Sequence, residues 1–115
     1  MKVKTVVPKL NKKEVARAMH KVFEQYDFCK RTPGDSEREE YVRKVKAAVN
    51  ALGGDEKNLV TQRYMIDFYR LDYQVYNFHF NPTISKDTYT KIRERAFLKL
   101  FVLFSENGLI QKESD

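Results

Sequence analysis

Hydrophobic residues recur with the period of an α-helix near the start of the chain. One stripe occupies positions separated by four, three, four and three residues, namely Val15, Met19, Val22, Tyr26 and Cys29. This spacing places all of them on one face of a helix of about five turns. Asn11 and Glu14 are spaced like an N-cap and its capping-box partner, and Thr32-Pro33-Gly34 is typical of a helix end.

Two more helices are predicted between residues 36 and 69. Ser36 and Glu39 form a second capping box, and the apolar stripe that follows reaches Leu52. Gly53-Gly54 would end this helix, because glycine is favoured at the residue after a helix C-terminus. Asp55 is the candidate N-cap of a third helix, which would extend to about residue 69.

The rest of the chain predicts a short helix, a turn and a long helix. Asp72 would cap the short helix, which Asn81-Pro82 would prevent from continuing beyond about residue 79. Ser85 is the next N-cap candidate, and a helical stripe follows it until Asn107-Gly108, a strong stop signal. Only residues 3–7 carry a strand-like pattern. The sequence therefore predicts an all-α fold of about five helices.

Positive charge is concentrated at the N-terminal end. The chain has 22 Lys and Arg against 16 Asp and Glu, and residues 1–33 alone hold nine basic and three acidic residues. Pro33-Gly34 is the best candidate for a hinge, so we expect a basic N-terminal helix over 1–33 and a helical domain over 34–115. Such an excess of basic residues is typical of proteins that bind a polyanion, although basic domains without such a partner are also common.

Several function classes find no support in the sequence. No apolar stretch approaches the roughly 20 residues of a membrane span, and the N-terminus is too polar for a signal peptide. Cys29 is the single cysteine, so no internal disulfide can form, and with His20 and His79 it offers no zinc-ligand spacing. There is no Gly-rich phosphate loop, metalloprotease motif or nucleophile elbow. We therefore expect a cytoplasmic protein without membrane contact, metal, cofactor or enzymatic activity.

The short helix, turn and basic helix over about residues 72–104 have the plan of a helix-turn-helix. In such a unit the second helix lies in the major groove of double-stranded DNA and presents side chains to base edges. On a helical wheel, the residues expected to face the bases are Lys86, Asp87, Thr88, Thr90, Lys91 and Glu94. The residues expected to contact phosphates are Tyr73, Gln74, Arg93, Arg95, Lys99, Lys12, Lys13 and Arg17. The alternative is a core helix with an ordinary solvated face.

The end of the long helix is apolar almost all round. Phe97, Leu98, Phe101 and Phe104 widen its stripe, and a helix of this kind is usually buried on all sides. Either the N-terminal helix covers it within one chain, or a second copy covers it in a homodimer. A two-fold dimer would suit a palindromic DNA site.

Several segments together point to one family. They are Arg63-Tyr64-Met65, Leu71 to Asn77, Ser85 to Tyr89, Ile92, Ala96 to Leu100 and the basic segment Asn11 to Arg31. In these segments the chain resembles the ArpU family of phage- and prophage-encoded transcriptional regulators, whose C-terminal part is similar to region four of sigma factors. The resemblance implies a protein of a bacterial host cell that binds double-stranded DNA and controls phage genes.

The turn at residues 78–84 departs from that family, because it is longer than the family's usual turn and has no glycine. Phe78 and Phe80 are too apolar to be left together in water, so we expect at least one of them to pack into the core and anchor the turn. If both were exposed, the two helices would not need to dock as in a DNA reader. The alternative function is a helical adaptor that binds RNA polymerase or another phage protein.

Overall fold

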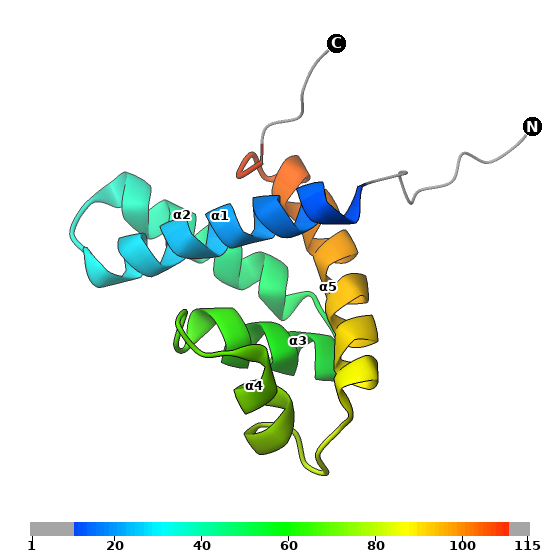
Figure 1. The fold of residues 1–115 in the computed structure, drawn as a ribbon. Helices are drawn as coiled ribbons and strands as arrows, with labels where there is room; N and C mark the ends of the chain where they lie inside the picture. The colour runs from blue at the N-terminus through cyan, green and yellow to red at the C-terminus, as the bar shows by residue number, and fades with distance from the viewer. Residues whose placement is uncertain (1–10, 111–115) are drawn as a thin grey trace, which may run out of the picture.

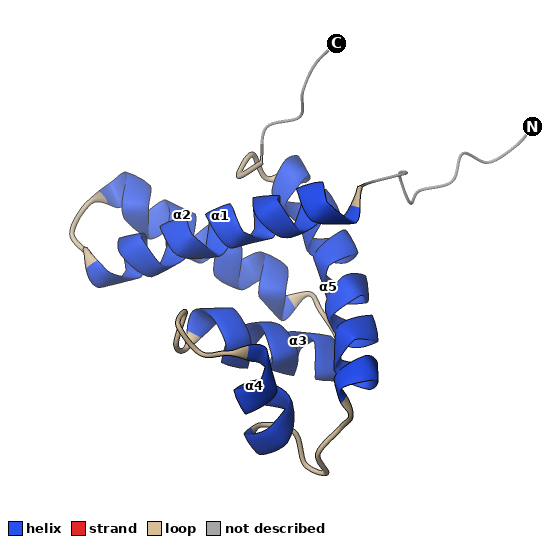
Figure 2. Ribbon diagram, viewed as in Figure 1, coloured by secondary structure: helices blue, strands red, loops and turns tan. Residues whose placement is uncertain are grey.

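The structure, a computed structural model, describes residues 11–110, and every regular element in them is helical (Figures 1 and 2). The elements are α1 (Lys12–Arg31), α2 (Ser36–Asn50), α3 (Gly54–Val60), the π-helical turn η1 (Thr61–Met65), α4 (Asp72–Phe78) and α5 (Lys86–Glu106). The predicted all-α fold is confirmed. The strand-like stretch at residues 3–7 lies outside the described part of the chain.

The first helix has the bounds that the sequence predicts. Asn11 is its N-cap, and the Asn11 side-chain oxygen accepts hydrogen bonds from the amides of Lys13 at 2.8 Å and Glu14 at 3.3 Å. These bonds satisfy two of the amides that a helix leaves unpaired at its start. At the other end, Gly34 has a φ of 104°, a left-handed conformation that favours glycine.

The predicted N-cap of the second helix is wrong by one residue. Asp35, not Ser36, caps α2, and its Oδ1 atom accepts from the amides of Glu37 at 2.9 Å and Arg38 at 3.0 Å. The hydrogen bond from the Arg38 amide is the main reason why the pKa of Asp35 is lowered. Because Asp and Ser are both good N-caps, adjacent candidates in the sequence do not decide which of them begins the helix.

The predicted caps of the next two helices are also shifted. Gly53 is the N-cap of α3 and Leu71 that of α4, so Asp55 and Asp72 lie inside the first turn instead. Carboxylates are favourable at both places, since the helix N-terminus carries partial positive charge over its whole first turn. The pattern therefore locates the helix starts but not their exact residue.

The third helix is shorter than predicted. Its α-helical hydrogen bonds end at Val60, and η1 continues it with wider turns until the Ile66 amide donates to the Thr61 carbonyl at 3.0 Å. A π-helical turn of this kind is rare and leaves no mark in the hydrophobic period. The chain leaves the helix at residue 66, so residues 66–71 form a connection rather than a helical end.

One hydrophobic core joins all the helices. Phe23 of α1 stacks on Tyr64 of η1 with ring centroids 5.1 Å apart and meets the edge of Phe104 of α5 at 6.0 Å. Tyr64 also contacts Phe97, whose ring centroid lies 5.8 Å away. The predicted boundary at residue 33 falls in the connection between α1 and α2, and α1 itself is an integral part of the core.

The long helix α5 makes contact with all the other α-helices of residues 11–110. It runs along one side of the molecule, and α1, α2 and α3 pack against it (Figure 1). Of the four residues that widen the apolar stripe, Phe97 and Phe104 are buried, whereas Leu98 and Phe101 are only half-buried. The packed helices therefore cover this end of α5 in part and not on all sides. A homodimer stays a prediction. No helix among residues 11–110 combines the length and the apolar character that a bilayer span needs.

Candidate nucleic-acid interface

The long turn between α4 and α5 is anchored in the core, as the sequence predicts. Phe80 is only 8% exposed and belongs to the core, whereas Phe78 is 74% exposed. A second anchor is polar, because the Asn58 side-chain amide of α3 donates to the His79 carbonyl at 2.8 Å. The turn therefore has fixed attachments although it contains no glycine.

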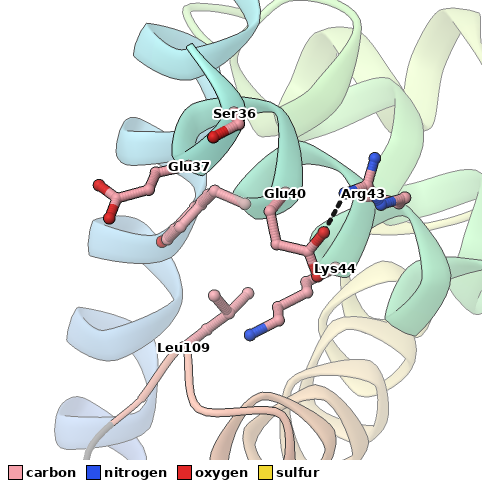
Figure 3. A pocket seen from close by; sticks show the side chains of 7 residues that line it. Ser36, Glu37, Glu40, Arg43, Lys44 and Leu109 are labelled. Carbon is pink, nitrogen blue, oxygen red and sulfur yellow. Dashed lines mark hydrogen bonds and ion pairs between the residues drawn. The ribbon is translucent and has the colours of Figure 1, made fainter.

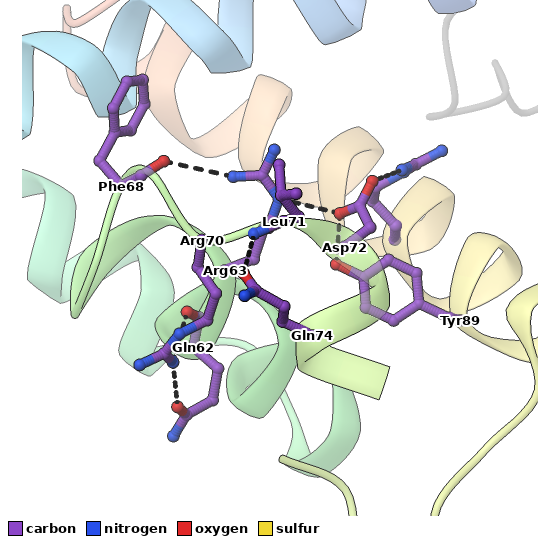
Figure 4. A network of polar contacts seen from close by, with 9 residues as sticks. Gln62, Arg63, Phe68, Arg70, Leu71, Asp72, Gln74 and Tyr89 are labelled. Carbon is purple, nitrogen blue, oxygen red and sulfur yellow. Dashed lines mark hydrogen bonds and ion pairs between the residues drawn. The ribbon is translucent and has the colours of Figure 1, made fainter. Parts of the chain in front are cut away.

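Asp72, at the start of α4, holds this helix against its neighbours (Figure 4). Its Oδ1 atom accepts from Arg63 Nε of η1 at 2.9 Å and from the Tyr89 hydroxyl of α5 at 2.7 Å. Its Oδ2 atom accepts from an Arg93 guanidinium nitrogen of α5 at 3.0 Å. We call these four residues the Asp72 cluster. A single carboxylate thus connects the two helices of the predicted helix-turn-helix.

Tyr89 is the most buried member of the Asp72 cluster. Burial, and next the hydrogen bond to Asp72, raise the pKa of Tyr89 far above its ordinary value, so the hydroxyl remains a donor. The ring also packs against Tyr76 of α4, with centroids 5.3 Å apart. The α4–α5 contact therefore combines a charge-assisted hydrogen-bond cluster with aromatic packing.

We expect Asp72→Asn to destabilise the fold by about 2 kcal/mol, because two arginines and a buried tyrosine hydroxyl would then face a neutral amide. The cost is no larger because the Asp72 carboxylate is partly exposed. Urea unfolding, followed by circular dichroism, measures the change. Glu24→Gln, on the exposed surface of α1, is the control, and we expect it to change the free energy of unfolding by less than about 0.5 kcal/mol. Equal stabilities of the two variants would show that the Asp72 cluster contributes nothing.

The face of α5 that the sequence assigns to DNA bases is solvent-accessible. Four of its predicted residues are exposed and two are half-buried; in chain order they are Lys86, Asp87, Thr88, Thr90, Lys91 and Glu94. Ser85 caps the helix as predicted, its Oγ atom accepting from the Thr88 amide at 3.1 Å. The Ser85 hydroxyl in turn donates to Thr88 Oγ1 at 3.1 Å, which leaves the Thr88 hydroxyl as a donor toward solvent.

All three predicted phosphate contacts on α5 already have partners within the protein. Arg93 belongs to the Asp72 cluster. Arg95 and Lys99 both pair with Glu56 of α3, at 3.4 Å and 2.9 Å, and this carboxylate is the one buried charged residue of the described chain. The Arg95 and Lys99 side chains are still more than half exposed, so each can present further donors to solvent. Contact of these residues with phosphates stays a prediction.

The two predicted phosphate contacts on α4 differ in whether their side chains already bond to the protein. Tyr73 is half-exposed on the first turn of the helix. Gln74 uses its side-chain oxygen to accept from the Leu71 amide at 2.8 Å, so this side chain also stabilises the start of α4. Only its amide nitrogen is left to donate to a ligand.

The N-terminal helix lies beside the candidate reading helix. Lys12 pairs with Glu94 of α5 at 3.4 Å, so the first turn of α1 is within reach of the middle of α5. Lys13 and Arg17 are exposed on the face of α1 opposite its buried stripe. The structure thus brings the two basic segments to neighbouring positions. Lys9, which precedes them, lies outside the described residues.

A groove of about 320 Å³ separates α1 from α5 at this point. Its lining combines three cationic side chains and a histidine with two aromatic rings: Lys12, Ala16, His20, Arg63, Tyr64, Arg93, Glu94 and Phe97. The guanidinium of Arg63 lies over the Tyr64 ring, 4.5 Å from its centroid. Because Asp72 and Glu94 already pair with the cations, we assign the groove no ligand of its own.

A second hollow, of about 500 Å³, lies between the start of α2 and the residues after α5 (Figure 3). Glu40 and Arg43 pair across its rim, and Lys44 donates to the Asn107 carbonyl at 3.1 Å. The hollow is open to solvent, and its lining offers no nucleophile with an adjacent base. Residues 11–110 also contain no group of three or more potential metal ligands.

The two acidic residues that hold the candidate interface together could not be recognised from the sequence pattern. Asp72 is predicted as a cap but instead bonds to side chains from two other elements, and Glu56 is buried although glutamates are usually exposed. Both contacts depend on how helices far apart in the sequence meet. The one hint is the four-residue spacing of Arg95 and Lys99, which places both cations on the same face of α5.

Comparison with protein-family models, with curated proteins and with solved structures found no match to the chain.

Proposed function

We propose that this protein is a non-enzymatic regulator of transcription that binds double-stranded DNA with α5 in the major groove. The observation that carries the proposal is the Asp72 cluster, which fixes α4 to α5 while the polar face of α5 stays open to solvent. A helix-turn-helix needs both properties, since its first helix sets the approach of its second. The resemblance to the ArpU family supports the same function in a bacterial cytoplasm, without a cofactor.

In this proposal different residues contact the bases and the phosphates. The first two turns of α5 read base edges, with Lys91 at the centre of the exposed face. Phosphates are contacted by Tyr73 on one side and by the first turns of α1 on the other, where Lys12 adjoins α5. The exposed face of α5 carries both charge signs, so the general affinity for DNA would come mainly from Lys13 and Arg17 on α1.

Selection from random double-stranded DNA tests the proposal. We expect one motif to be enriched, and we expect Lys91→Ala to reduce the preference for that motif by roughly 1–3 kcal/mol without loss of stability. Lys46→Ala, which removes an exposed lysine from α2, is the matched control and should leave the preference unchanged. An enriched motif that Lys91→Ala binds with unaltered preference would remove Lys91 from the reading set.

The second candidate function is an adaptor that binds RNA polymerase or another phage protein. It is favoured by the exposed apolar side chains around residues 66–71, which a DNA reader does not require. The same selection discriminates the two functions, because an adaptor would enrich no DNA motif.

A further inference from the structure

Glu94 is a carboxylate on the face of α5 that the proposed function assigns to DNA bases. It follows Lys91 by three residues, about one helical turn, and its side chain is 43% exposed. Its Oε2 atom pairs with the Lys12 ammonium of α1 at 3.4 Å, and both residues line the groove between the two helices. The fold of α1 against α5 therefore places a cation beside an acidic residue of the candidate interface.

A carboxylate in this position can help DNA binding only opposite a hydrogen-bond donor, because the phosphates on either side of the major groove repel it. Of the four bases, only cytosine and adenine present a donor in that groove. The adenine amino group lies between two acceptors, adenine N7 and thymine O4, which also repel a carboxylate. The cytosine N4 amino group has an acceptor on one side only, so cytosine is the base that suits Glu94 best.

The Lys12 ammonium offsets the repulsion between Glu94 and the phosphates and draws the carboxylate toward the α1 side of the reading face. Exposed ion pairs of this kind contribute little to the stability of a fold, so the effect of Lys12 would be on the placement of Glu94. A lysine ammonium has three donors, and Lys12 can therefore hold Glu94 and still face a phosphate. The ion pair is thus compatible with the phosphate contact expected of α1.

We propose that Glu94 accepts a hydrogen bond from the N4 amino group of a cytosine and that Lys12 is its positioning residue. The inference rests on the proposed function, because it needs α5 in the major groove. Lys91 would donate to a guanine, the commonest specific contact of a basic side chain. Three residues advance about 4.5 Å along a helix and one base pair about 3.4 Å along DNA, so the two residues would read G·C pairs one or two steps apart.

Selection from random double-stranded DNA, with the full chain and its variants, tests the inference. We expect Glu94→Gln to lose the cytosine preference at one position of the motif and to favour adenine there roughly tenfold, because a glutamine amide matches the donor and acceptor of adenine. Lys12→Gln should weaken the cytosine preference at the same position, and Lys12→Arg, which keeps the ion pair, should retain it.

Two matched controls separate base reading from general effects of charge. Glu106→Gln changes an exposed glutamate at the end of α5 and should leave every position of the motif unchanged. Lys13→Gln changes the exposed lysine next to Lys12 and should weaken binding to all sequences alike, because a phosphate contact carries no sequence information. Thermal unfolding of each variant confirms that its fold is intact.

Three outcomes would contradict the inference. An enriched motif that Glu94→Gln binds with unaltered preference would show that Glu94 contacts no base, and the proposed function would still stand. Equal weakening of all sequences by Lys12→Gln would overturn the positioning role and limit Lys12 to a phosphate contact. If the wild type enriches no motif at all, the proposed function fails and this inference fails with it.

Discussion

Deletion of residues 1–31 should abolish the cooperative fold rather than only weaken DNA binding. The deletion removes six buried residues of α1, among them Met19 and Phe23, which are completely buried. Truncation of one such side chain to alanine alone costs about 2–5 kcal/mol. Because a domain of this kind is stable by only about 5–15 kcal/mol in total, the remaining chain cannot compensate for the loss of a whole helix.

Urea unfolding followed by circular dichroism measures this effect, and binding of a hydrophobic dye should report the exposed face of α5. A truncated chain that still unfolds in one cooperative transition would contradict the prediction. In that case the basic N-terminal helix would be an appendage, and residues 34–115 would be a domain of their own, as the charge distribution suggests.

The contribution of α1 to DNA binding must therefore be tested without removing it. The double variant Lys13→Gln/Arg17→Gln changes two exposed charges and leaves the buried stripe intact, which makes it the matched control for the deletion. If both residues contact phosphates, the slope of log affinity against log salt concentration should decrease by about 0.9 for each phosphate that the variant no longer neutralises. An unchanged slope in the folded variant would show that α1 serves only the core.

Phe80→Ala should destabilise the protein by about 3–5 kcal/mol, the range for a buried phenylalanine. Phe80 is the apolar anchor of the turn between α4 and α5, and its loss would leave a cavity where the turn meets the core. Phe78→Ala removes a ring of the same kind two residues earlier. Since Phe78 is exposed, we expect this control to change stability by less than about 0.5 kcal/mol.

Equilibrium unfolding in urea, with the same probe for both variants, gives the two values. DNA binding by Phe80→Ala should recover when the variant is stabilised at low temperature, if the turn acts only through folding. Two variants as stable as the wild type would show that the turn is not anchored, and the adaptor function would then be favoured over DNA reading.

The fold was predictable from the sequence where the signal is local. The stripe from Val15 to Cys29 and the caps Asn11 and Ser85 predicted their helices correctly, because hydrophobic period and capping act within a few residues. The predicted start of α2 was displaced because Asp35 and Ser36 are both good N-caps. Those of α3 and α4 were displaced because the carboxylates of Asp55 and Asp72 are also favourable inside the first turn. The end of α3 was missed because η1 has no sequence signature.

For the candidate site, the sequence predicted which face of α5 is exposed but not the contacts that its charged residues make. The exposed face of α5 follows from its period, and Lys86 and Lys91 are exposed on it. The ion pairs of Arg93 and Arg95 could not be foreseen, because Asp72 and Glu56 lie on other elements and approach α5 only in the folded chain. The sequence alone therefore cannot tell which charged residues of a predicted DNA-binding helix are available to DNA and which form ion pairs within the protein.

The way in which α4 is held has a consequence for its local stability. This helix has seven residues and buries only Val75, so it is far shorter than a helix that forms alone in water. Its order depends on Asp72 at one end and on the anchored turn at the other. Amide protons of residues 72–78 would then exchange with solvent through local opening, whereas those in the middle of α5 would require global unfolding. A ligand that contacts both helices would slow exchange in α4 first, and this change would identify binding across the α4–α5 unit.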